Sequence, residues 1–238
     1  MSCASQSPNL FLNLLPARAY ASIAPHLQAA ELPQGQTLFD AGDAVTRVYF
    51  PHFGVVSLIV SLSSGEMIET GMVGRDSLAA GSASLDGKIS LNKSIVQIAG
   101  QASALPMDRL RRAADEHAEI KTALIRNEQA ILVQAQQSAA CNISHTLEAR
   151  LARWLLRCRD LMQSDSLDLT QEFISEMMGV RRTSVSIIAG TLQKAGLIQY
   201  RRGHIHIADL EGLRDASCEC YETVKAHTDR LLNDRSGI

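Results

Sequence analysis

The pattern of hydrophobic and polar positions changes sharply at Pro106. From about residue 31 to 106, short apolar runs such as "RVYFPHFG" and "VVSLIVSLSSGEMIE" alternate with glycines. Runs of four to eight residues rich in Val, Ile, Phe and Tyr, repeated at intervals of about ten, are typical of strands in a β sandwich or barrel. Ser64-Gly65 predicts a hairpin between two of them, because glycine tolerates positive φ. The first part of the chain is therefore predicted to be all β.

After Pro106 the pattern becomes helical. No proline or glycine occurs from Met107 to about Met162, and alanine, glutamine, leucine and charged residues dominate. Spacings of four, seven, four and three connect a set of apolar and small residues: Ile120, Leu124, Ile131, Ala135 and Ser138. Such a narrow seam predicts a coiled-coil dimer interface. The alternative is that this helix packs on its own β domain. A second amphipathic helix follows in "SHTLEARLARWLLRCRDLM".

The segment "LTQEFISEMMGVRRTSVSII" predicts two short helices joined by a turn. Thr170 is a suitable N-cap for the first helix, and Gly179 is suited to end it in a left-handed conformation. The second helix begins near Arg181 and keeps Val185, Ile188 and Leu192 inward at spacings of three and four. This arrangement is typical of a helix-turn-helix. Two alternating strands around "RRG" in "LIQYRRGHIHIA" predict a winged extension.

Charge is concentrated in this segment. The chain of 238 residues has a formal net charge of −2, yet from residue 181 to 208 it contains basic residues and no Asp or Glu. Its basic residues are Arg181, Arg182, Lys194, Arg201 and Arg202. A local excess of positive charge in a slightly acidic chain indicates phosphate binding, so we expect double-stranded DNA as a partner.

The order of the predicted parts and the motif "LTQEFISEMMGVRRTSVSII...LQKAGLI...RRGHIHI" resemble the cyclic-AMP receptor protein and fumarate-nitrate regulator (Crp/Fnr) superfamily of bacterial transcription regulators. The resemblance runs from about Leu27 to Leu213 and implies an α+β fold in three parts. These are a cyclic-nucleotide-binding-like β roll (residues 1–114), a dimerisation helix (115–140) and a winged helix-turn-helix DNA-binding domain (141–238). It also implies a homodimer on a palindromic operator, and contact with RNA polymerase if the protein activates transcription.

In that family the second helix of the motif lies in the major groove. Alignment on Gly179 places Arg182, Thr183 and Ser186 at the base-reading positions, and we expect Arg182 to contact guanine through two hydrogen bonds. Arg181 is expected to meet phosphate, as are Arg201 and Arg202 in the wing. The complete predicted DNA-binding set is Arg181, Arg182, Thr183, Ser184, Ser186, Arg201 and Arg202. Threonine stands where the family often has glutamate, so the operator preference should differ.

Family members that bind cyclic AMP carry a Gly-Glu pair for the ribose and an Arg-Ser-Ala stretch for the phosphate. Here Gly74-Arg75-Asp76 and "SLNKSIV" stand in those places, and neither Lys88 nor Lys93 replaces the arginine convincingly. We therefore predict regulation independent of cyclic AMP, with an unknown effector and no cofactor. Before residue 141 the chain has only Cys3, which excludes the family's iron-sulfur mechanism, and His52 alone does not suffice for haem.

No metal site is predicted, because the remaining cysteines, Cys141, Cys158, Cys218 and Cys220, lack paired C-x-x-C spacing. The chain has no nucleophile elbow, P-loop, zinc helix motif or dinucleotide fingerprint, so an enzyme is not expected. Lack of a signal peptide or membrane span predicts a cytoplasmic location without membrane contact. The alternative function is a ligand-binding regulatory module whose helical C-terminus mediates only protein contacts; the basic segment argues against it.

Overall fold

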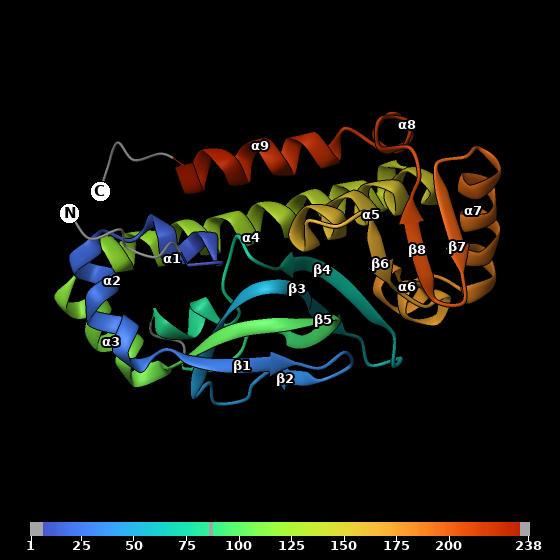
Figure 1. The fold of residues 1–238 in the computed structure, drawn as a ribbon. Helices are drawn as coiled ribbons and strands as arrows, with labels where there is room; N and C mark the ends of the chain where they lie inside the picture. Colours follow the sequence, from blue (N-terminus) through green and yellow to red (C-terminus); the bar gives the residue numbers. More distant parts are fainter. Residues whose placement is uncertain (1–6, 86–87, 234–238) are drawn as a thin grey trace.

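The computed structural model describes residues 7–85 and 88–233 and has an α+β fold (Figure 1). An N-terminal β roll and a smaller C-terminal unit are connected by long helices. The strands are β1 (Gln28–Leu32), β2 (Thr37–Phe39), β3 (Arg47–Ser61), β4 (Met67–Val73), β5 (Lys93–Pro106), β6 (Ser166–Asp168), β7 (Ile198–Arg201) and β8 (His204–Ile207). The α-helices are α1 (Leu10–Leu14), α2 (Ala17–Ile23), α3 (Met107–Glu116), α4 (Ala118–Ser144), α5 (Leu147–Met162), α6 (Gln171–Met178), α7 (Arg182–Lys194), α8 (Leu210–Ala216) and α9 (Cys220–Asn233). Two short 3-10 helices, η1 (Ala24–His26) and η2 (Gly81–Ser84), complete the described elements.

The β roll is built around the long strands β3 and β5, which pair antiparallel. The strand order is β1-β5-β3-β4, and β2 also pairs with β5. The predicted hairpin joins β3 and β4, and Gly65 has a φ of 89° there. His52, expected in a loop, lies within β3, where its Nε2 is 2.9 Å from the hydroxyl of Ser103.

The β3–β5 crossing depends on glycine. A Cβ atom on Gly100 would lie 2.1 Å from the carbonyl oxygen of Phe53, and one on Gly54 would lie 2.9 Å from Cα of Gly100. Both approaches are closer than non-bonded atoms allow. The pairing register also shifts between Phe53 and Val55. Glycine at these two positions therefore permits the bulge that curves the sheet.

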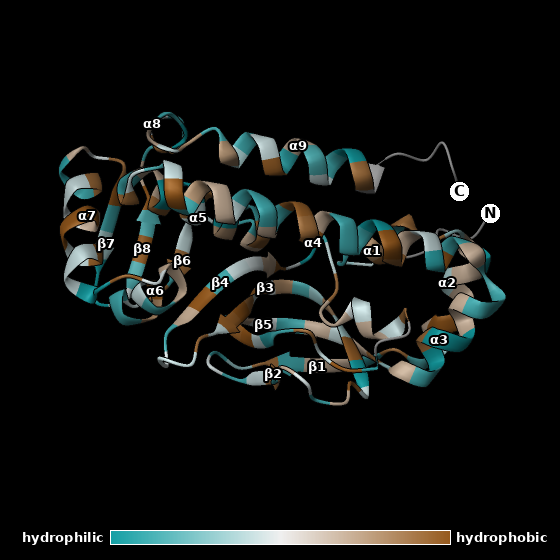
Figure 2. Ribbon diagram, turned by 180° about the vertical axis from the view of Figure 1, so that it is seen from behind, coloured by the Kyte–Doolittle hydropathy of each residue, from teal (hydrophilic) through white to brown (hydrophobic). Residues whose placement is uncertain are grey.

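Helix α4 contains 27 residues, so it is about 40 Å long. Buried polar side chains attach one of its faces to the β roll: the hydroxyl of Ser77 donates to Asn127 Oδ1 at 2.5 Å, and the backbone N–H of Met72 donates to Gln134 Oε1 at 3.2 Å. A second face lies against α9, which runs alongside α4 on the side away from the sheet (Figures 1 and 2). Helix α9 therefore extends away from the winged unit with which it was grouped.

This arrangement corrects the predicted coiled-coil seam. Ile120 and Leu124 are 0% exposed and pack in the core of the β roll with residues such as Phe11 and Leu110. The prediction that these two side chains face a partner helix is wrong, because their own chain already covers them. Ser138 is also buried, and Ile131 packs partly against the β roll. At the start of α4 the alternative, a helix packed on its own β domain, is confirmed.

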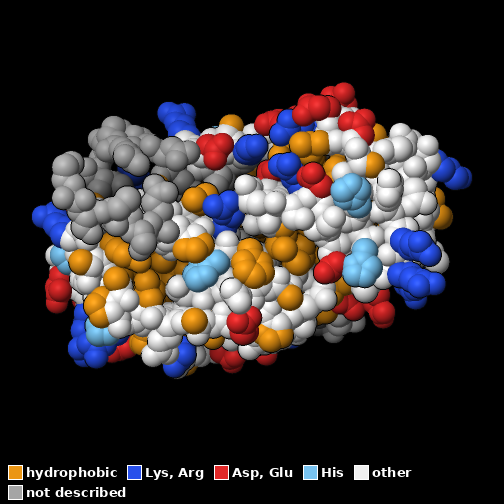
Figure 3. Space-filling model, in the orientation of Figure 1, with side chains coloured by type: hydrophobic (Ala, Val, Ile, Leu, Met, Phe, Trp, Pro, Cys, Tyr) orange, Lys and Arg blue, Asp and Glu red, His pale blue; other side chains and the backbone are white. Residues whose placement is uncertain are grey.

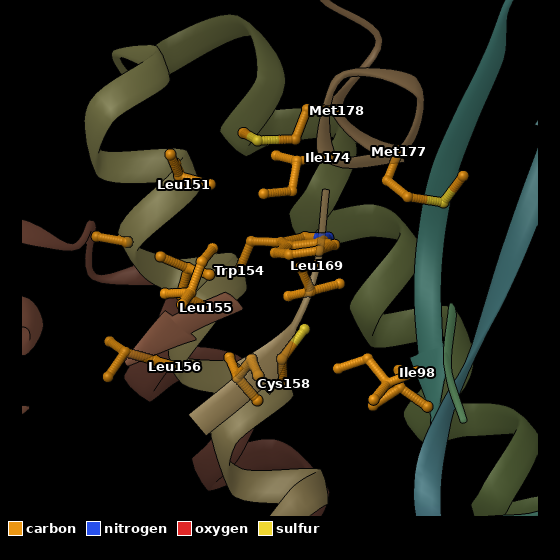
Figure 4. Packing of buried hydrophobic residues seen from close by; sticks show 14 of the residues in the cluster. Ile98, Leu151, Trp154, Leu155, Leu156, Cys158, Leu169, Ile174, Met177 and Met178 are labelled. Atoms are coloured by element: carbon orange, nitrogen blue, oxygen red, sulfur yellow. The ribbon is translucent and has the colours of Figure 1, made fainter. Parts of the chain in front are cut away.

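One continuous core joins the β roll to the C-terminal unit (Figure 4). Ile98 from β5 packs in the same cluster as Trp154 and Leu155 of α5 and Ile174 of α6. Trp154 is 3% exposed and the other three are at most 3% exposed. Burial of this apolar surface holds the helix-turn-helix against the β roll. None of the helices within residues 7–85 and 88–233 combines the length and the hydropathy needed to cross a bilayer.

Candidate nucleic-acid interface

The helix-turn-helix forms as its sequence predicts. The side chain of Thr170 accepts a hydrogen bond from the backbone N–H of Phe173 and so caps α6. Gly179 ends α6 with a φ of 62° and a ψ of 41°, in the left-handed region. Buried Ser175 lets α6 and α7 approach closely; its hydroxyl donates to the carbonyl oxygen of Glu172 at 2.6 Å. These local signals fix the angle at which α7 leaves the turn.

Helix α7 has one buried face and one exposed face. Val185, Ala189 and Leu192 are at most 3% exposed, whereas Ile188, predicted to point inward, is half-buried. Among the predicted DNA-binding residues on this helix and its N-cap, Arg181, Arg182, Thr183 and Ser186 are exposed and Ser184 is half-buried. The exposed side chains lie on the first two turns, where a helix inserted in the major groove meets base edges.

Two exposed residues on the same face were missed from the sequence. Ile187 is 68% exposed, and Thr191, one turn further along, is also exposed. An isolated isoleucine within the run "SVSII" reads as a core residue, so its exposure became visible only once Val185 and Ala189 were known to point inward. On the exposed face of α7, Ile187 can contact a thymine methyl group.

The wing is the hairpin of β7 and β8, and β6 pairs with β8 to extend it to three strands. Arg202 and Gly203 form the tip with positive φ values of 51° and 83°, as a tight hairpin turn requires. Arg201 and Arg202 are exposed. His204 also points outward, and its Nδ1 lies 2.6 Å from Asp168 Oδ1. The tip thus presents adjacent guanidinium groups to solvent.

Tyr200 and Gln193 fix the wing beside α7. The phenol of Tyr200 donates to the carbonyl oxygen of Leu169 at 2.9 Å, and the backbone N–H of Tyr200 donates to Gln193 Oε1 at 2.7 Å. Burial raises the pKa of Tyr200 to about 12, although the nearby Arg182 cation opposes the shift. The phenol therefore remains a hydrogen-bond donor at neutral pH.

A groove of about 410 Å³ separates the wing tip from the start of α6. Arg182 and Arg202 line it together with Thr170 and Gln171 at the helix N-terminus, and Glu172 adds a carboxylate. Guanidinium groups beside a helix N-terminus favour an anion such as a phosphate. Ser186 is held at the same end of α7, because its hydroxyl donates to Gln171 Oε1 at 2.5 Å. In Figure 3, Lys and Arg side chains gather at the end of the molecule formed by α7 and the wing.

The third face of α4 is covered neither by the β roll nor by α9. It carries exposed hydrophobic side chains: Ile125 is 43%, Leu132 56% and Ile143 89% exposed. With the exposed Gln129, Gln136 and Ala139, they follow one another at spacings of three or four. We call this set the α4 stripe. It is displaced by about one residue, or roughly 100° around the helix, from the seam predicted at Leu124, Ile131 and Ser138.

Between the β roll and α4 lies another groove, of about 290 Å³. Ser90, Leu91 and Asn92 from the segment "SLNKSIV" line it, and Glu128 of α4 is the charged residue among its lining side chains. Burial raises the pKa of Glu128. Neither candidate lysine serves this groove: Lys93 Nζ is 3.1 Å from Asp40 Oδ1, and Lys88 lines a separate depression beside Arg111.

Asp76, which stands in place of the family's glutamate, has a partner within this chain. Its Oδ2 is 2.8 Å from a guanidinium nitrogen of Arg157 in α5, and both side chains are largely buried. This ion pair ties the end of β4 to the C-terminal unit. The carboxylate that would correspond to a ribose ligand is therefore engaged in a contact between the two parts of the fold.

Comparisons with known proteins agree with this architecture. Residues 149–216 match the Crp-like helix-turn-helix domain. The chain is 25% identical over 190 residues to the global nitrogen regulator of Synechococcus elongatus, covering 76% of this chain and 86% of the relative. Solved structures with the same fold include FixK2 from Bradyrhizobium japonicum (TM-score 0.68, 16% identity, 81% of this chain and 98% of that chain). A transcriptional regulator of the CRP family from Thermus thermophilus has a TM-score of 0.66 and 22% identity, covering 79% of this chain and 96% of that chain.

Proposed function

Because this chain belongs to the Crp/Fnr superfamily of DNA-binding transcription regulators, we propose that it binds a palindromic operator as a homodimer, without cyclic AMP. The proposal places it in the cytoplasm, with no catalytic role. RNA polymerase becomes a further partner where bound protein activates transcription.

The exposed leading edge of α7 carries the proposal. Arg182, Thr183, Ser186 and Ile187 offer bases a guanidinium, hydroxyl and apolar groups, while Arg181 and the wing arginines offer cations to phosphate. Specific DNA binding needs both kinds of contact: phosphate contacts position the protein and base contacts select the sequence. The alternative of a purely protein-binding C-terminus leaves this combination without a purpose.

The α4 stripe supports dimerisation. Hydrophobic side chains that recur every three or four residues along a long helix form the seam of a two-stranded coiled coil. Leu132 and Ile143 are too exposed to stabilise the monomer, and a second copy of the same helix would cover them. A two-fold axis along α4 would present two α7 helices to DNA, about 34 Å apart for half-sites one helical turn apart.

Independence from cyclic AMP rests on the charge in the groove between the β roll and α4. A buried phosphate needs a paired cation or several amide donors. Glu128 brings a carboxylate to this groove, while Lys93 is paired with Asp40. Phosphate bound there would lie near an acid instead of a guanidinium, which disfavours a cyclic nucleotide.

Selection of binding sites from random DNA by the purified chain, with and without cyclic AMP, tests the proposal. We expect a palindrome in both selections, and a sedimenting mass of two chains. Enrichment only with cyclic AMP, or micromolar binding of cyclic AMP or cyclic GMP by calorimetry, would contradict independence from the nucleotide. Recovery of no preferred sequence in either selection would favour the protein-binding alternative.

A further inference from the structure

Four metal-ligating side chains meet where the end of α4 lies against the junction of α8 and α9. Cys141 and His145 come from the last turn and C-cap of α4, and Cys218 and Cys220 flank the start of α9. One ligand atom from each residue lies within 4.8 Å of the other three. Cys141 Sγ is 3.5 Å from Cys218 Sγ, and Cys220 Sγ is 3.6 Å from His145 Nδ1.

These separations match those around a tetrahedral metal ion. With Zn–S bonds of about 2.3 Å and Zn–N bonds of about 2.0 to 2.1 Å, neighbouring ligand atoms lie roughly 3.5 to 3.8 Å apart. A disulfide would need a sulfur separation of about 2.05 Å, much shorter than the one between Cys141 and Cys218. The cluster therefore has the spacing of ligands around one ion.

The local folding of each segment aims the donors at one point. Cys141 and His145 are four residues apart, so a helical turn places them on the same side of α4. Cys218 and Cys220 lie two residues apart, with α8 ending just before them and α9 beginning at Cys220. The three cysteines are at most 6% exposed and form a small cluster of their own.

Neighbouring polar groups support the donors in the way that metal sites require. His145 Nε2 lies 3.1 Å from Glu219 Oε2, so this nitrogen can donate its proton to the carboxylate and leave Nδ1 free to bind a metal. Gln137 Nε2 donates to Cys220 Sγ at 3.0 Å. The guanidinium of Arg153 acts electrostatically on Cys141, and that of Arg150 on Cys141 and Cys218, which balances the charge of thiolates.

We propose that Cys141, His145, Cys218 and Cys220 bind one Zn²⁺ ion. Three thiolates and an imidazole are the ligand set of closed structural zinc sites, and four protein ligands leave no position for a substrate. Such donors do not suit Mg²⁺ or Ca²⁺, which prefer oxygen. This inference goes beyond the proposed function and does not depend on it.

Bound zinc would join the C-terminal helices to the end of α4. Immediately after His145 the chain enters α5, the first helix of the DNA-binding unit. The ion would therefore hold α9 along α4 and fix the point where the dimerisation helix meets that unit. Metal binding would make this connection rigid without touching the predicted DNA-contacting side chains.

Metal binding by the full reduced chain, measured without DNA, tests the proposal. We expect about one equivalent of Zn²⁺ per chain, and Co²⁺ in its place should give the intense visible absorption of tetrahedral thiolate coordination. Cys141→Ser and Cys218→Ser should each abolish the Co²⁺ absorption. Cys158→Ser is the matched control, because the thiol of Cys158 lies near Gln97 and Met72 in a different core, and it should retain full binding.

Glu219→Gln keeps the test decisive should a cysteine variant fail to fold, because the Glu219 side chain is 75% exposed. We expect it to fold normally and to bind Zn²⁺ about 10-fold more weakly. No stoichiometric binding by the reduced chain, undiminished binding by Cys141→Ser and Cys218→Ser, or unchanged affinity in Glu219→Gln would each overturn the proposal. A Cys141–Cys218 disulfide in a chain that binds no metal once reduced would overturn it in favour of a redox pair.

Discussion

The indole Nε1–H of Trp154 donates a hydrogen bond of 3.0 Å to Oε1 of Glu69, and so links α5 of the DNA-binding unit to β4 of the β roll. The other carboxylate oxygen, Oε2, lies 2.5 Å from the hydroxyl of Ser57, which is also 2.5 Å from Gln97 Oε1. One hydroxyl hydrogen cannot serve two acceptors, so a protonated Glu69 that donates to Ser57 satisfies both contacts. Desolvation raises the pKa of Glu69 to about 7, against the opposing effects of Ser57, Arg153, Trp154 and Arg157.

This carboxyl group should make the stability of the chain depend on pH. Because its folded pKa of about 7 exceeds the ordinary value of 4.5, the folded state binds the proton more tightly than the unfolded state. The free energy of unfolding should therefore fall as the pH rises from about 4.5 to about 7, by up to about 3 kcal/mol. Glu69→Gln should be more stable than the parent at pH 8 and lose that advantage at pH 5, as measured by urea unfolding.

Glu66→Gln, on the exposed hairpin next to β4, is the control for that series. Its stability profile should follow that of the parent chain at every pH. Equal effects of the two substitutions would show that the carboxyl of Glu69 is no more sensitive to burial than a surface group.

Gly179 and Ile68 should be energetically coupled. A Cβ atom on Gly179 would lie 3.1 Å from Cγ1 of Ile68, and the backbone φ of 62° already disfavours any side chain. Gly179→Ala should cost about 1 to 2 kcal/mol for the backbone alone, plus a further amount for the contact with the β roll. A double-mutant cycle with Ile68→Ala should recover that further amount; strictly additive free energies would show that the hairpin does not restrain the turn.

Local signals made the helix-turn-helix readable from the sequence. Thr170, Gly179 and Val185 each act on residues within one or two helical turns, so their caps and inward positions follow from spacing. Their structural roles are confirmed, whereas the base contacts of Arg182, Thr183 and Ser186 stay predictions.

Features that depend on distant parts of the chain were not readable in this way. Periodicity identified α4 as a long helix, but which of its faces remains exposed depends on where the β roll and α9 pack, and so Ile120 and Leu124 were assigned to the wrong face. The Cys141–Cys218 contact spans 77 positions, and no spacing rule relates two such thiols. The helix α9 that brings them together lies in the part of the chain where the family resemblance was weakest.

Arg182 and Arg202 should differ in how they affect DNA binding. Arg182→Ala should cost about 1 to 3 kcal/mol on the selected operator and relax the preference at one symmetric pair of base positions. Arg202→Ala should weaken binding to all sequences alike and reduce the salt slope by about one per site contacted. Fluorescence anisotropy at several salt concentrations, with operator and scrambled DNA, measures both effects. Identical behaviour of the two variants would contradict the assigned roles.

Ile187 and the adjacent Ile188 separate recognition from packing. Ile187 is 68% exposed, so Ile187→Ala should leave Tm unchanged and lower operator affinity, most strongly where a thymine methyl faces the helix. Ile188 packs against the core that joins the two parts of the fold, so Ile188→Ala should lower the free energy of unfolding by about 1 to 3 kcal/mol. A drop in Tm for Ile187→Ala comparable to that of Ile188→Ala would contradict its exposed placement.

Leu132 at the centre of the α4 stripe should control the oligomeric state. It is 56% exposed in the single chain, so a charge there costs little in the monomer, but in a coiled coil two such charges would meet at the seam. Leu132→Glu should therefore sediment as a monomer with unchanged secondary structure. Because a monomer contacts only one half-site, its affinity for the palindrome should fall at least about 100-fold, while weak binding to a single half-site persists. Leu62→Glu is the matched control, since Leu62 is 44% exposed on the β3–β4 hairpin, away from the stripe, and this variant should remain dimeric. A dimeric Leu132→Glu would exclude the stripe as the seam and return the interface to the half-buried Ile131 and Ala135.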